Sequence, residues 1–363
     1  MGAFILKKLS FNSYATEWIN NINKNKYVCI FGAGNLGKEW CRLIEEYNLP
    51  LKIDFIVDND SEKWGEKVYG KYECKSPEEL DKYDKGISIV IATRYFKDIL
   101  KQLTEKGFRN IFIPNENRMY FLSNFIYCNN FDKYIEAKEN FIKLLEICED
   151  EESKEVCSKV FENWFSEKFI NIKNAGNQYF LDEIFKLTNQ EVFVDCGAYT
   201  GDTIKSFLDK VSSFSKIYAF ELEKNIYKKL EIYISKLEEK NKIKLYNIGV
   251  YDSKKTIKYN TNDTSSAIDI IGENEGLIDT LDNIINDKVT FIKMDIEGAE
   301  LNALIGAKNI IKRQKPKLAI CTYHKPEHLW EIPFLIKKIL PEYKIYMRHH
   351  SDNYTETVCY AKI

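Results

Sequence analysis

The chain has 363 residues, a length that suits two domains of ordinary size. Its 53 Lys and Arg and its 55 Asp and Glu give a formal charge of −2, whereas a nucleic-acid-binding domain is normally strongly basic. Hydrophobic residues make up 44% of the sequence, which is enough to bury two cores and excludes wholesale disorder. We therefore expect a globular protein that does not bind nucleic acid.

The sequence indicates neither a secretory leader nor a membrane span. No apolar stretch follows the basic pair Lys7-Lys8, so we expect no signal peptide. No run approaches the ~18 apolar residues of a membrane helix. The nine cysteines are scattered without a C-x-x-C pair, which argues against a zinc ribbon and against a disulfide framework. These features predict a cytoplasmic protein with reduced thiols.

The first glycine-rich turn lies between two apolar runs. Residues 27–31 precede the turn Gly32-Ala-Gly-Asn-Leu-Gly37, an amphipathic stretch follows, and residues 53–58 form the second run. Strand, glycine turn, helix and strand in this order predict a βαβ unit of a parallel, doubly wound sheet. We expect the sheet to continue with a strand at 87–92, a helix at 95–106 and a strand at 110–113.

This turn has the spacing of a dinucleotide-binding fingerprint. Its residues are Gly32, Gly34, Asn35 and Gly37, and Asp58 follows 21 residues after the last glycine. A carboxylate at that place disfavours a 2′-phosphate, so NAD or a nucleotide sugar fits better than NADP. Residues 38–118 contain no dehydrogenase set such as Tyr-x-x-x-Lys. The alternative is an empty module that mediates dimerisation.

A second glycine-rich turn, Cys196-Gly-Ala-Tyr-Thr-Gly201, follows an apolar run at 192–195 and precedes another at 217–221. Gly197 and Gly201 would let a ligand approach the backbone closely. Glu221, which ends the second run, is placed to accept hydrogen bonds from ribose hydroxyls. The pattern fits NAD or S-adenosylmethionine, and the alternative is a tight turn with a surface acid.

The helical pattern of residues 119–187 predicts a connector between domains at 1–118 and 188–363. In the last domain we expect strands at 242–250, 289–295 and 317–322, a polar loop through Gly276 and a helix at 299–313. The runs 343–348 and 355–363 predict an antiparallel hairpin, with His349 and His350 in a solvated turn. A parallel sheet finished by such a hairpin is the outline of a class I methyltransferase.

The motifs of this last domain follow one another in a specific order. They are residues 192–203, Phe220-Glu-Leu-Glu223, Asn247-Ile-Gly-Val-Tyr-Asp252, Thr280-Leu-Asp282 and Phe291-Ile-Lys-Met-Asp-Ile-Glu-Gly-Ala-Glu300. Over residues 188–363 the chain resembles FkbM-type S-adenosylmethionine-dependent methyltransferases. This resemblance implies O-methylation, often of sugar or polyketide hydroxyls.

The resemblance also implies roles for particular residues. The implied cofactor-binding residues are Asp195, Gly197 and Gly201 for the methionine end and the turn, Tyr199 in the same turn, Glu221 for the ribose, Asp252 for the adenine amine, and Asp295 near the methyl group. Asp295 and Glu297 would face the methyl group and the acceptor, and His324 follows the next strand.

A hydroxyl group is a poor nucleophile while it is protonated, so a base or a metal ion should assist the transfer. The candidates for taking the proton are Asp295, Glu297 and His324, and the same three side chains could hold a divalent ion. We interpret Glu300 as a first-turn acid favoured by the helix dipole. His328 follows His324 by four residues, but the proline between them argues against a zinc pair on one helix.

The first domain has a weaker resemblance of its own. Residues 55–65, Ser76-Pro77 and residues 102–107 resemble the N-terminal domains of sugar-modifying enzymes, including PglD-like sugar acetyltransferases. The resemblance covers residues 25–115 and implies a holder for a nucleotide-linked sugar.

The sequence as a whole predicts an α/β protein with two Rossmann-like doubly wound sheets. The predicted function is S-adenosylmethionine-dependent O-methylation of a sugar or glycan precursor, with that small molecule or glycan as the partner. A homodimer is compatible with this predicted function. The alternatives are an NAD-dependent sugar oxidoreductase and a non-catalytic nucleotide-binding scaffold.

Overall fold

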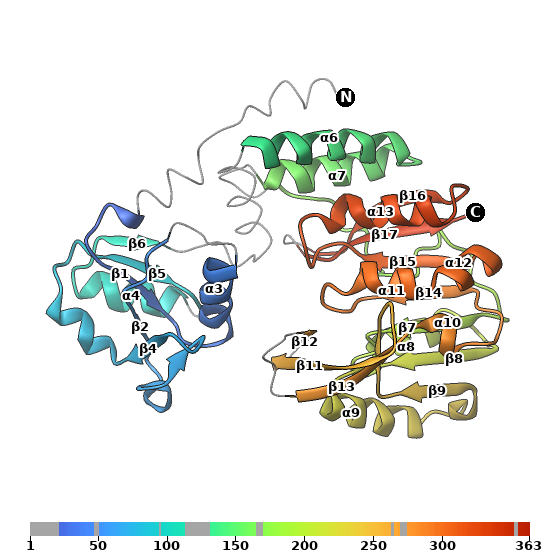
Figure 1. Ribbon diagram of the computed structural model, residues 1–363, viewed down its shortest axis with the longest axis horizontal. Helices are drawn as coiled ribbons and strands as arrows, with labels where there is room; N and C mark the ends of the chain where they lie inside the picture. Colours follow the sequence, from blue (N-terminus) through green and yellow to red (C-terminus); the bar gives the residue numbers. More distant parts are fainter. Residues whose placement is uncertain are drawn as a thin grey trace. The chain divides into compact units, whose positions relative to one another are not determined.

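The computed structural model describes residues 22–46, 51–93, 96–112, 131–164, 170–262, 265–268, 274–351 and 355–363. Contacts divide the chain into two compact units, residues 3–138 with 162–168 and residues 139–161 with 169–363 (Figure 1). Each unit contains a sheet dominated by parallel pairing, which confirms the predicted α/β fold with two separate sheets. The three-part division at residues 118 and 187 stays a prediction.

The first unit is built on a six-stranded sheet of order β3-β4-β2-β1-β5-β6. Only the pairing of β3 with β4 is antiparallel among these described strands. In chain order the elements are β1 (Val28–Phe31), α3 (Asn35–Glu46), β2 (Phe55–Val57), β3 (Lys67–Val68), β4 (Tyr72–Lys75), β5 (Ser88–Ile91), α4 (Phe96–Glu105) and β6 (Asn110–Phe112). The strands and helices predicted for this part of the chain are thereby confirmed.

The burial of strand β1 illustrates why the sequence predicts these strands. Its four residues are all buried. Val28 and Ile30 belong to one core cluster and Cys29 and Phe31 to another, because successive side chains of a strand point to opposite faces of the sheet. A strand that is buried on both faces has a continuous apolar sequence.

Two helices, α6 (Phe131–Ile147) and α7 (Glu151–Asn163), confirm part of the predicted helical stretch. The prediction is wrong for residues 170–187, which form turns and irregular backbone without a helix. Gly176 and Tyr179 have φ values of 79° and 70°, which are incompatible with a right-handed helix. The buried side chains of this segment instead join the core of the second unit.

The second unit is built on a seven-stranded sheet of order β16-β17-β15-β14-β7-β8-β9. Its elements are β7 (Val192–Cys196), α8 (Asp202–Leu208), β8 (Lys216–Phe220), α9 (Lys224–Ser235), β9 (Ile243–Tyr246), α10 (Leu281–Ile284), β14 (Phe291–Met294), α11 (Glu300–Gly306), α12 (Lys308–Gln314), β15 (Lys317–Cys321), α13 (His328–Ile339), β16 (Lys344–His349) and β17 (Thr357–Lys362). Strand β17 is antiparallel to both β15 and β16, so the predicted C-terminal hairpin is confirmed. The single helix predicted at 299–313 is two helices, α11 and α12.

One face of this sheet carries both aromatic core residues and buried charged side chains. Phe193, Phe291 and Tyr360 belong to the core cluster that includes the buried side chains of residues 179–185. Asp195 and Lys293 lie two positions after the two phenylalanines, so they point to this same face. One buried acid and one buried base therefore lie under the irregular segment.

A small sheet replaces the polar loop that the sequence predicts before Gly276. Its order is β10-β13-β11-β12, with β10 (Gly249–Val250), β11 (Lys255–Asn262), β12 (Ser265–Ile268) and β13 (Asn274–Asp279). Antiparallel pairing satisfies the backbone hydrogen bonds of β11, while most of its described side chains stay exposed. Such a strand has no apolar run, and this is why the expectation of a loop was wrong.

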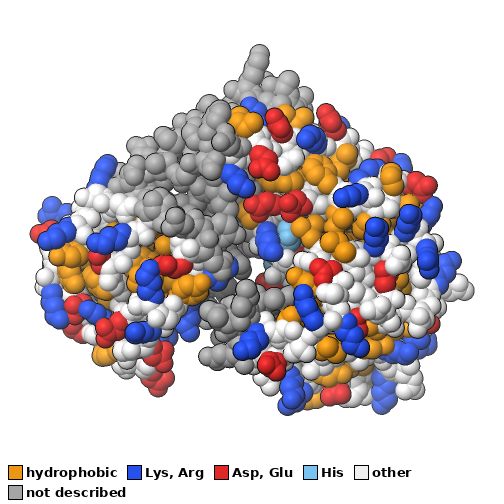
Figure 2. All heavy atoms as spheres, viewed as in Figure 1, with side chains coloured by type: hydrophobic (Ala, Val, Ile, Leu, Met, Phe, Trp, Pro, Cys, Tyr) orange, Lys and Arg blue, Asp and Glu red, His pale blue; other side chains and the backbone are white. Residues whose placement is uncertain are grey.

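The visible surface of the described residues mixes charges of both signs (Figure 2). Lys and Arg side chains are interspersed with Asp and Glu side chains over both units, as the balanced composition leads one to expect. In the part of the chain that the structure describes, no helix is both long enough and apolar enough to cross a membrane.

Candidate functional site

A cavity of about 640 Å³ opens in the second unit where the carboxyl ends of β7, β8 and β14 meet. Open α/β sheets bind ligands at this edge, and small-molecule sites usually have roughly 300–1,000 Å³. The lining includes Gly197, Tyr199, Glu221, Asp295 and Glu297, together with Gln178, Tyr179, Asp202, Glu223, Lys293, Tyr323 and Glu356. The structure thus brings five of the residues predicted from the sequence to one cavity.

Glu221 holds the turn that follows β7. Its Oε2 accepts a hydrogen bond from the backbone N–H of Tyr199 at 3.0 Å, and its Oε1 accepts one from the N–H of Glu223 at 2.8 Å. Burial raises the pKa of Glu221, although the two backbone donors act in the opposite direction. A carboxylate can accept about four hydrogen bonds. Glu221 therefore keeps capacity for the hydroxyl groups of a ligand in the cavity.

The glycines of the turn are required by close packing. Gly197 has a φ of 80°, and a Cβ there would lie 1.9 Å from the backbone oxygen of Asp295. Gly201 has a φ of 96°, and a Cβ there would lie 2.4 Å from the ring of Tyr233. Gly197 lines the cavity, whereas Gly201 begins helix α8 and is not among the lining residues.

Asp195 lies next to the cavity but is fully buried, and it is not among the lining residues. Its Oδ1 lies 3.1 Å from Nζ of Lys293, which also donates a hydrogen bond of 2.8 Å to the backbone oxygen of Gly197. Burial raises the pKa of Asp195 to about 6, and Lys293 opposes this shift. Asp195 thus contacts Lys293, which in turn holds the turn at Gly197, and its contact with the cofactor stays a prediction.

Asp252, predicted near an adenine amine, also lies outside the lining. Its Oδ2 accepts a hydrogen bond of 2.6 Å from the amide of Asn302, and its Oδ1 accepts one from Ser253. These bonds keep the pKa of Asp252 below its usual value despite partial burial. Gly249 and Val250, which precede it in the chain, do line the cavity.

At the other end of the cavity, three donors surround the carboxylate of Asp295. Its Oδ2 accepts a hydrogen bond of 2.8 Å from the hydroxyl of Tyr179, and its Oδ1 accepts one of 3.1 Å from Tyr323. Nε2 of His324 lies 3.3 Å from the same Oδ1. These three groups orient the Asp295 carboxylate within the cavity.

His324 is oriented by Glu300, a buried acid that the sequence reading treated only as a first-turn residue of a helix. Oε1 of Glu300 lies 2.8 Å from Nδ1 of His324 and accepts the backbone N–H of Ile296 at 2.9 Å. Its Oε2 lies 3.3 Å from Nδ1 of His328. Burial opposes the charge on His324, but Glu300, with smaller effects of Asp295 and Glu297, raises the pKa of His324 to about 9. His324 is therefore protonated at neutral pH.

Two of the three predicted metal ligands, Asp295 and His324, lie close together, and Glu300 completes a group whose ligand atoms are all within 4.8 Å of one another. The third predicted ligand, Glu297, is not part of this group, although its Oε2 lies 3.8 Å from Nε2 of His324. A metal ligand must present an unprotonated ring nitrogen, whereas the carboxylates around His324 favour its protonated form. A divalent ion at this place stays a prediction.

The sequence reading missed Tyr179 and Glu356, which come from segments far from the glycine turn. It also placed His349 and His350 in a solvated turn, which is wrong for His349. His349 is fully buried at the end of β16, whereas His350 directly follows the strand and is half-buried, and burial lowers the pKa of His350 to about 4. The hydrophobic run that leads into His349 is the signal that could have indicated its burial.

The fingerprint of the first unit has the predicted local geometry. Gly32 has a φ of 125°, and a Cβ at Gly37 would lie 1.9 Å from the backbone oxygen of Gly32, whereas Gly34 faces open space. Asn35 begins α3. Asp58 accepts the backbone N–H of Ala33 at 2.7 Å and also lies near Lys63, so its carboxylate is already engaged. NAD, a nucleotide or a nucleotide sugar in this unit stays a prediction.

Class I methyltransferases have one antiparallel strand between the last strands of an otherwise parallel sheet, and β17 occupies that place. With a ligand-sized cavity at the ends of β7, β8 and β14, the second unit defines a protein of this class. Residues 195–350 match the family model described as the methyltransferase FkbM domain. Residues 195–350 are therefore similar to the FkbM methyltransferase domain, and the protein is an S-adenosylmethionine-dependent methyltransferase.

Among the solved structures similar to this chain, the FkbM methyltransferase structure shows the same fold. The crystal structure of methyltransferase FkbM from Methylobacillus flagellatus is 22% identical, with a TM-score of 0.65 over 95% of this chain and 92% of that chain. An rRNA methylase from Streptococcus thermophilus is 14% identical, covers 50% of this chain and 89% of its own, and has a TM-score of 0.33. Fibrillarin from Aeropyrum pernix, with natively bound S-adenosyl-L-methionine, is 11% identical with a TM-score of 0.31 over 50% of this chain and 71% of that chain. None of the curated proteins matches the chain.

Proposed function

We propose that the protein transfers a methyl group from S-adenosylmethionine in the cavity to a hydroxyl group of a sugar or glycan precursor. The observation that carries this proposal is that Glu221 and Asp295, which follow two different strands, line one cavity. When bound, S-adenosylmethionine supplies an electrophilic methyl group on a positively charged sulfur. The resemblance to FkbM-type enzymes supports a hydroxyl group as the acceptor.

The charge of the cavity fits a cationic cofactor. The acidic lining residues are Asp202, Glu221, Glu223, Asp295, Glu297 and Glu356. The basic lining residue Lys293 is buried and paired with Asp195, so its charge is largely compensated. A cavity lined by one sign of charge attracts ligands of the other sign. We assign the ribose to Glu221 and the methionine end to the turn at Gly197 and Tyr199.

The acceptor end must bind a hydroxyl group and receive its proton. His324 already carries a proton at neutral pH, so it cannot accept another and instead adds a positive charge beside the carboxylates. Asp295 is held by three donors and orients groups in the cavity. Glu297 lies 3.8 Å from His324 with its side chain 32% exposed, and we assign the proton acceptor to it.

Calorimetry with S-adenosylmethionine and S-adenosylhomocysteine tests the cofactor site. The wild type should bind both, and Glu221→Gln should weaken binding at least about tenfold, because the amide cannot accept the same set of hydrogen bonds. Asp252→Asn is the matched control and should leave the affinity unchanged. A folded wild type that binds neither compound contradicts the proposal.

Transfer of a tritiated methyl group tests the acceptor. Free sugars, nucleotide sugars and oligosaccharide precursors are offered in parallel, with Glu297→Gln as the variant that should retain cofactor binding and lose turnover. Methylation of a nitrogen or of a protein in place of a hydroxyl group would refute the acceptor class.

A further inference from the structure

The residues that complete the acceptor end of the cavity come from an irregular segment, residues 174–179, which we call the strap. Gln178 and Tyr179 of the strap line the cavity. The Tyr179 hydroxyl donates to Oδ2 of Asp295 at 2.8 Å, and the amide of Gln178 donates to Oε2 of Glu356 at 2.6 Å. Nζ of Lys293 lies 5.2 Å from the centre of the Tyr179 ring. The strap thus contacts the charged groups at this end of the cavity.

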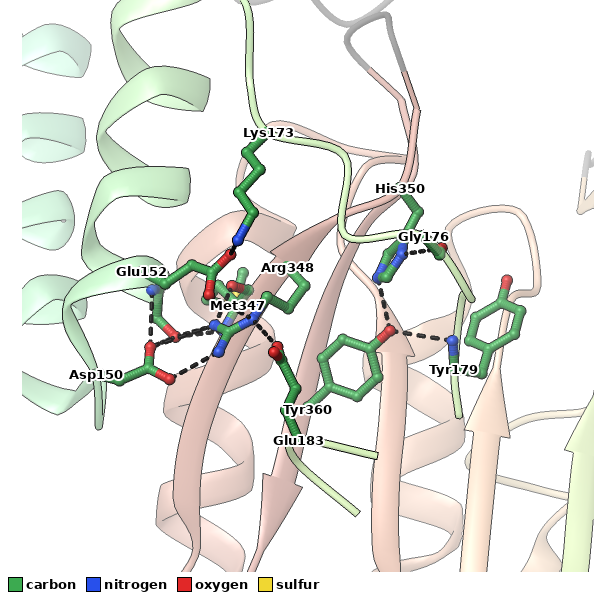
Figure 3. A network of polar contacts seen from close by, with 11 residues as sticks. Asp150, Glu152, Lys173, Gly176, Tyr179, Glu183, Met347, Arg348, His350 and Tyr360 are labelled. Atoms are coloured by element: carbon green, nitrogen blue, oxygen red, sulfur yellow. Dashed lines mark hydrogen bonds and ion pairs between the residues drawn. The ribbon is translucent and has the colours of Figure 1, made fainter. Parts of the chain in front are cut away.

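Tyr179 has a φ of 70°, a conformation that a residue with a side chain adopts only when its surroundings enforce it. The backbone N–H of Tyr179 donates to the hydroxyl of Tyr360 at 3.0 Å. That hydroxyl lies 2.7 Å from Nε2 of His350, and Nδ1 of His350 lies 2.9 Å from the backbone oxygen of Gly176 (Figure 3). Tyr360 and His350 therefore tie both ends of a short turn of the strap.

These contacts fix the protonation of His350. The oxygen of Gly176 can only accept, so Nδ1 carries the hydrogen and Nε2 accepts from the Tyr360 hydroxyl. The Tyr360 oxygen is then free to accept the N–H of Tyr179. Burial lowers the pKa of His350 to about 4, which keeps this neutral tautomer at physiological pH. Each of these three hydrogen bonds then has one donor and one acceptor, without conflict at any atom.

The chain on both sides of the strap is anchored as well. Arg348, which is 4% exposed, donates to Glu183 at 2.8 Å and to Asp150 at 2.8 Å. Lys173 lies 2.7 Å from Glu152 (Figure 3). Strand β16 thus supplies Arg348 to the residues after the strap, and His350, the first residue after this strand, contacts the strap itself. Anchors on both sides leave little freedom for the residues between them.

We propose that the strap is a positioning element of the methyl-transfer site, in which Tyr360 and His350 fix the backbone at Tyr179, and the Tyr179 hydroxyl fixes the Asp295 carboxylate toward the transferred methyl group. This inference rests on the proposed function. Tyr179 and Tyr360 are positioning residues, since they act through Asp295. Tyr360 lies on β17 and does not line the cavity, so any effect of Tyr360 on the ligand has to pass through the strap.

Two ligands distinguish positioning from a general structural role. Sinefungin carries a protonated amine in place of the methylsulfonium group, whereas S-adenosylhomocysteine lacks both the methyl group and its charge. An Asp295 carboxylate held toward the methyl group should favour sinefungin. The quantity to measure is the ratio of the two dissociation constants, determined by calorimetry, because a loss of folded protein changes both constants together and leaves the ratio unchanged.

The variants are Tyr179→Phe, Tyr360→Phe and, as the matched control, Tyr343→Phe, which removes a buried hydroxyl that donates to Pro316 at 2.6 Å. Tyr179→Phe should reduce the preference for sinefungin roughly three- to tenfold, the effect expected for one lost charge-assisted hydrogen bond. Tyr360→Phe should reduce it in the same direction and should accelerate hydrogen exchange in residues 174–180. Tyr343→Phe should do neither.

An unchanged ratio in both Tyr179→Phe and Tyr360→Phe, with normal binding by the wild type, overturns the positioning role and leaves the proposed function standing. A wild type that binds neither ligand removes the proposed function, and the inference about the strap falls with it. Faster exchange in Tyr343→Phe equal to that in Tyr360→Phe would also overturn the inference, because the effect would then not be specific to the strap.

Discussion

Glu300→Gln is the sharpest test of the electrostatics at the acceptor end. The substitution keeps the size of the side chain and removes the negative charge that pairs with His324 and His328. The displacement of the His324 pKa from 6.5 to about 9 corresponds to about 3.4 kcal/mol of preference for the charged imidazole. Without Glu300, only Asp295 and Glu297 oppose the effect of burial, so the pKa of His324 should fall clearly below 9.

The sign of the effect on stability follows from linkage. Because the folded-state pKa of His324 lies above its unfolded value, the stabilisation is complete below about pH 6.5 and is lost as the pH rises to about 9. At pH 7 the variant should lose about 3–5 kcal/mol of unfolding free energy, as expected when one partner of a buried ion pair is removed. The variant should also lose the decline in stability between pH 6.5 and pH 9.

Two measurements check this prediction. The chain has four histidines, so their ring signals in isotope-labelled protein can be followed through a pH titration by NMR. Urea unfolding at several pH values gives the stability. Glu149→Gln is the control, since this exposed carboxylate pairs with Lys344 at 2.7 Å and should contribute only about 0–1 kcal/mol. A His324 that titrates near 6.5 in the wild type, or near 9 in Glu300→Gln, would refute the reasoning.

Three further predictions follow from buried or strained positions. Lys293→Met leaves the Asp195 carboxylate buried without a partner and should lower the free energy of unfolding in urea by about 3–5 kcal/mol. The control, Lys216→Met, breaks a more exposed pair and should lower it by about 0–1 kcal/mol, so equal losses in the two variants would contradict the prediction. The folded-state pKa of His350 lies below its unfolded value, so stability should fall by about 1–3 kcal/mol as the pH falls from about 6.5 to about 4, and His350→Gln should remove this dependence in acid titrations followed by fluorescence. Gly197→Ala puts a methyl group against the backbone oxygen of Asp295 and should abolish cofactor binding in calorimetry, so retained affinity would argue against the turn as its site.

The sequence predicted those elements of the fold whose pattern lies in consecutive residues. The apolar run at Val192 and the glycines after it predicted β7 and its turn, because strand burial and positive φ values leave marks in consecutive residues. The acid at the end of β8 was placed correctly for the same reason. The polar strand β11 has no apolar run, because its backbone is paired while most of its described side chains are exposed.

The candidate site was only partly predictable. Asp295, Glu297 and His324 were named from their motifs, and the structure brings them together. The charge of His324 was not predictable, because it depends on a buried Glu300 that in the sequence has the form of an ordinary first-turn acid. Tyr179 was not predictable either, since it lies 116 residues from the Asp295 that it contacts.

The sequence by itself determined the two βαβ units, the order of the strands along the chain and the chemical types of the acids at the strand ends. Each of these depends on neighbouring residues and on backbone conformations that few residue types allow. Only the tertiary structure decided which acids line the cavity, which form buried ion pairs with partners such as Lys293, and which histidine is charged. Those properties depend on burial and on contacts between distant segments, for which the linear sequence has no periodic signal.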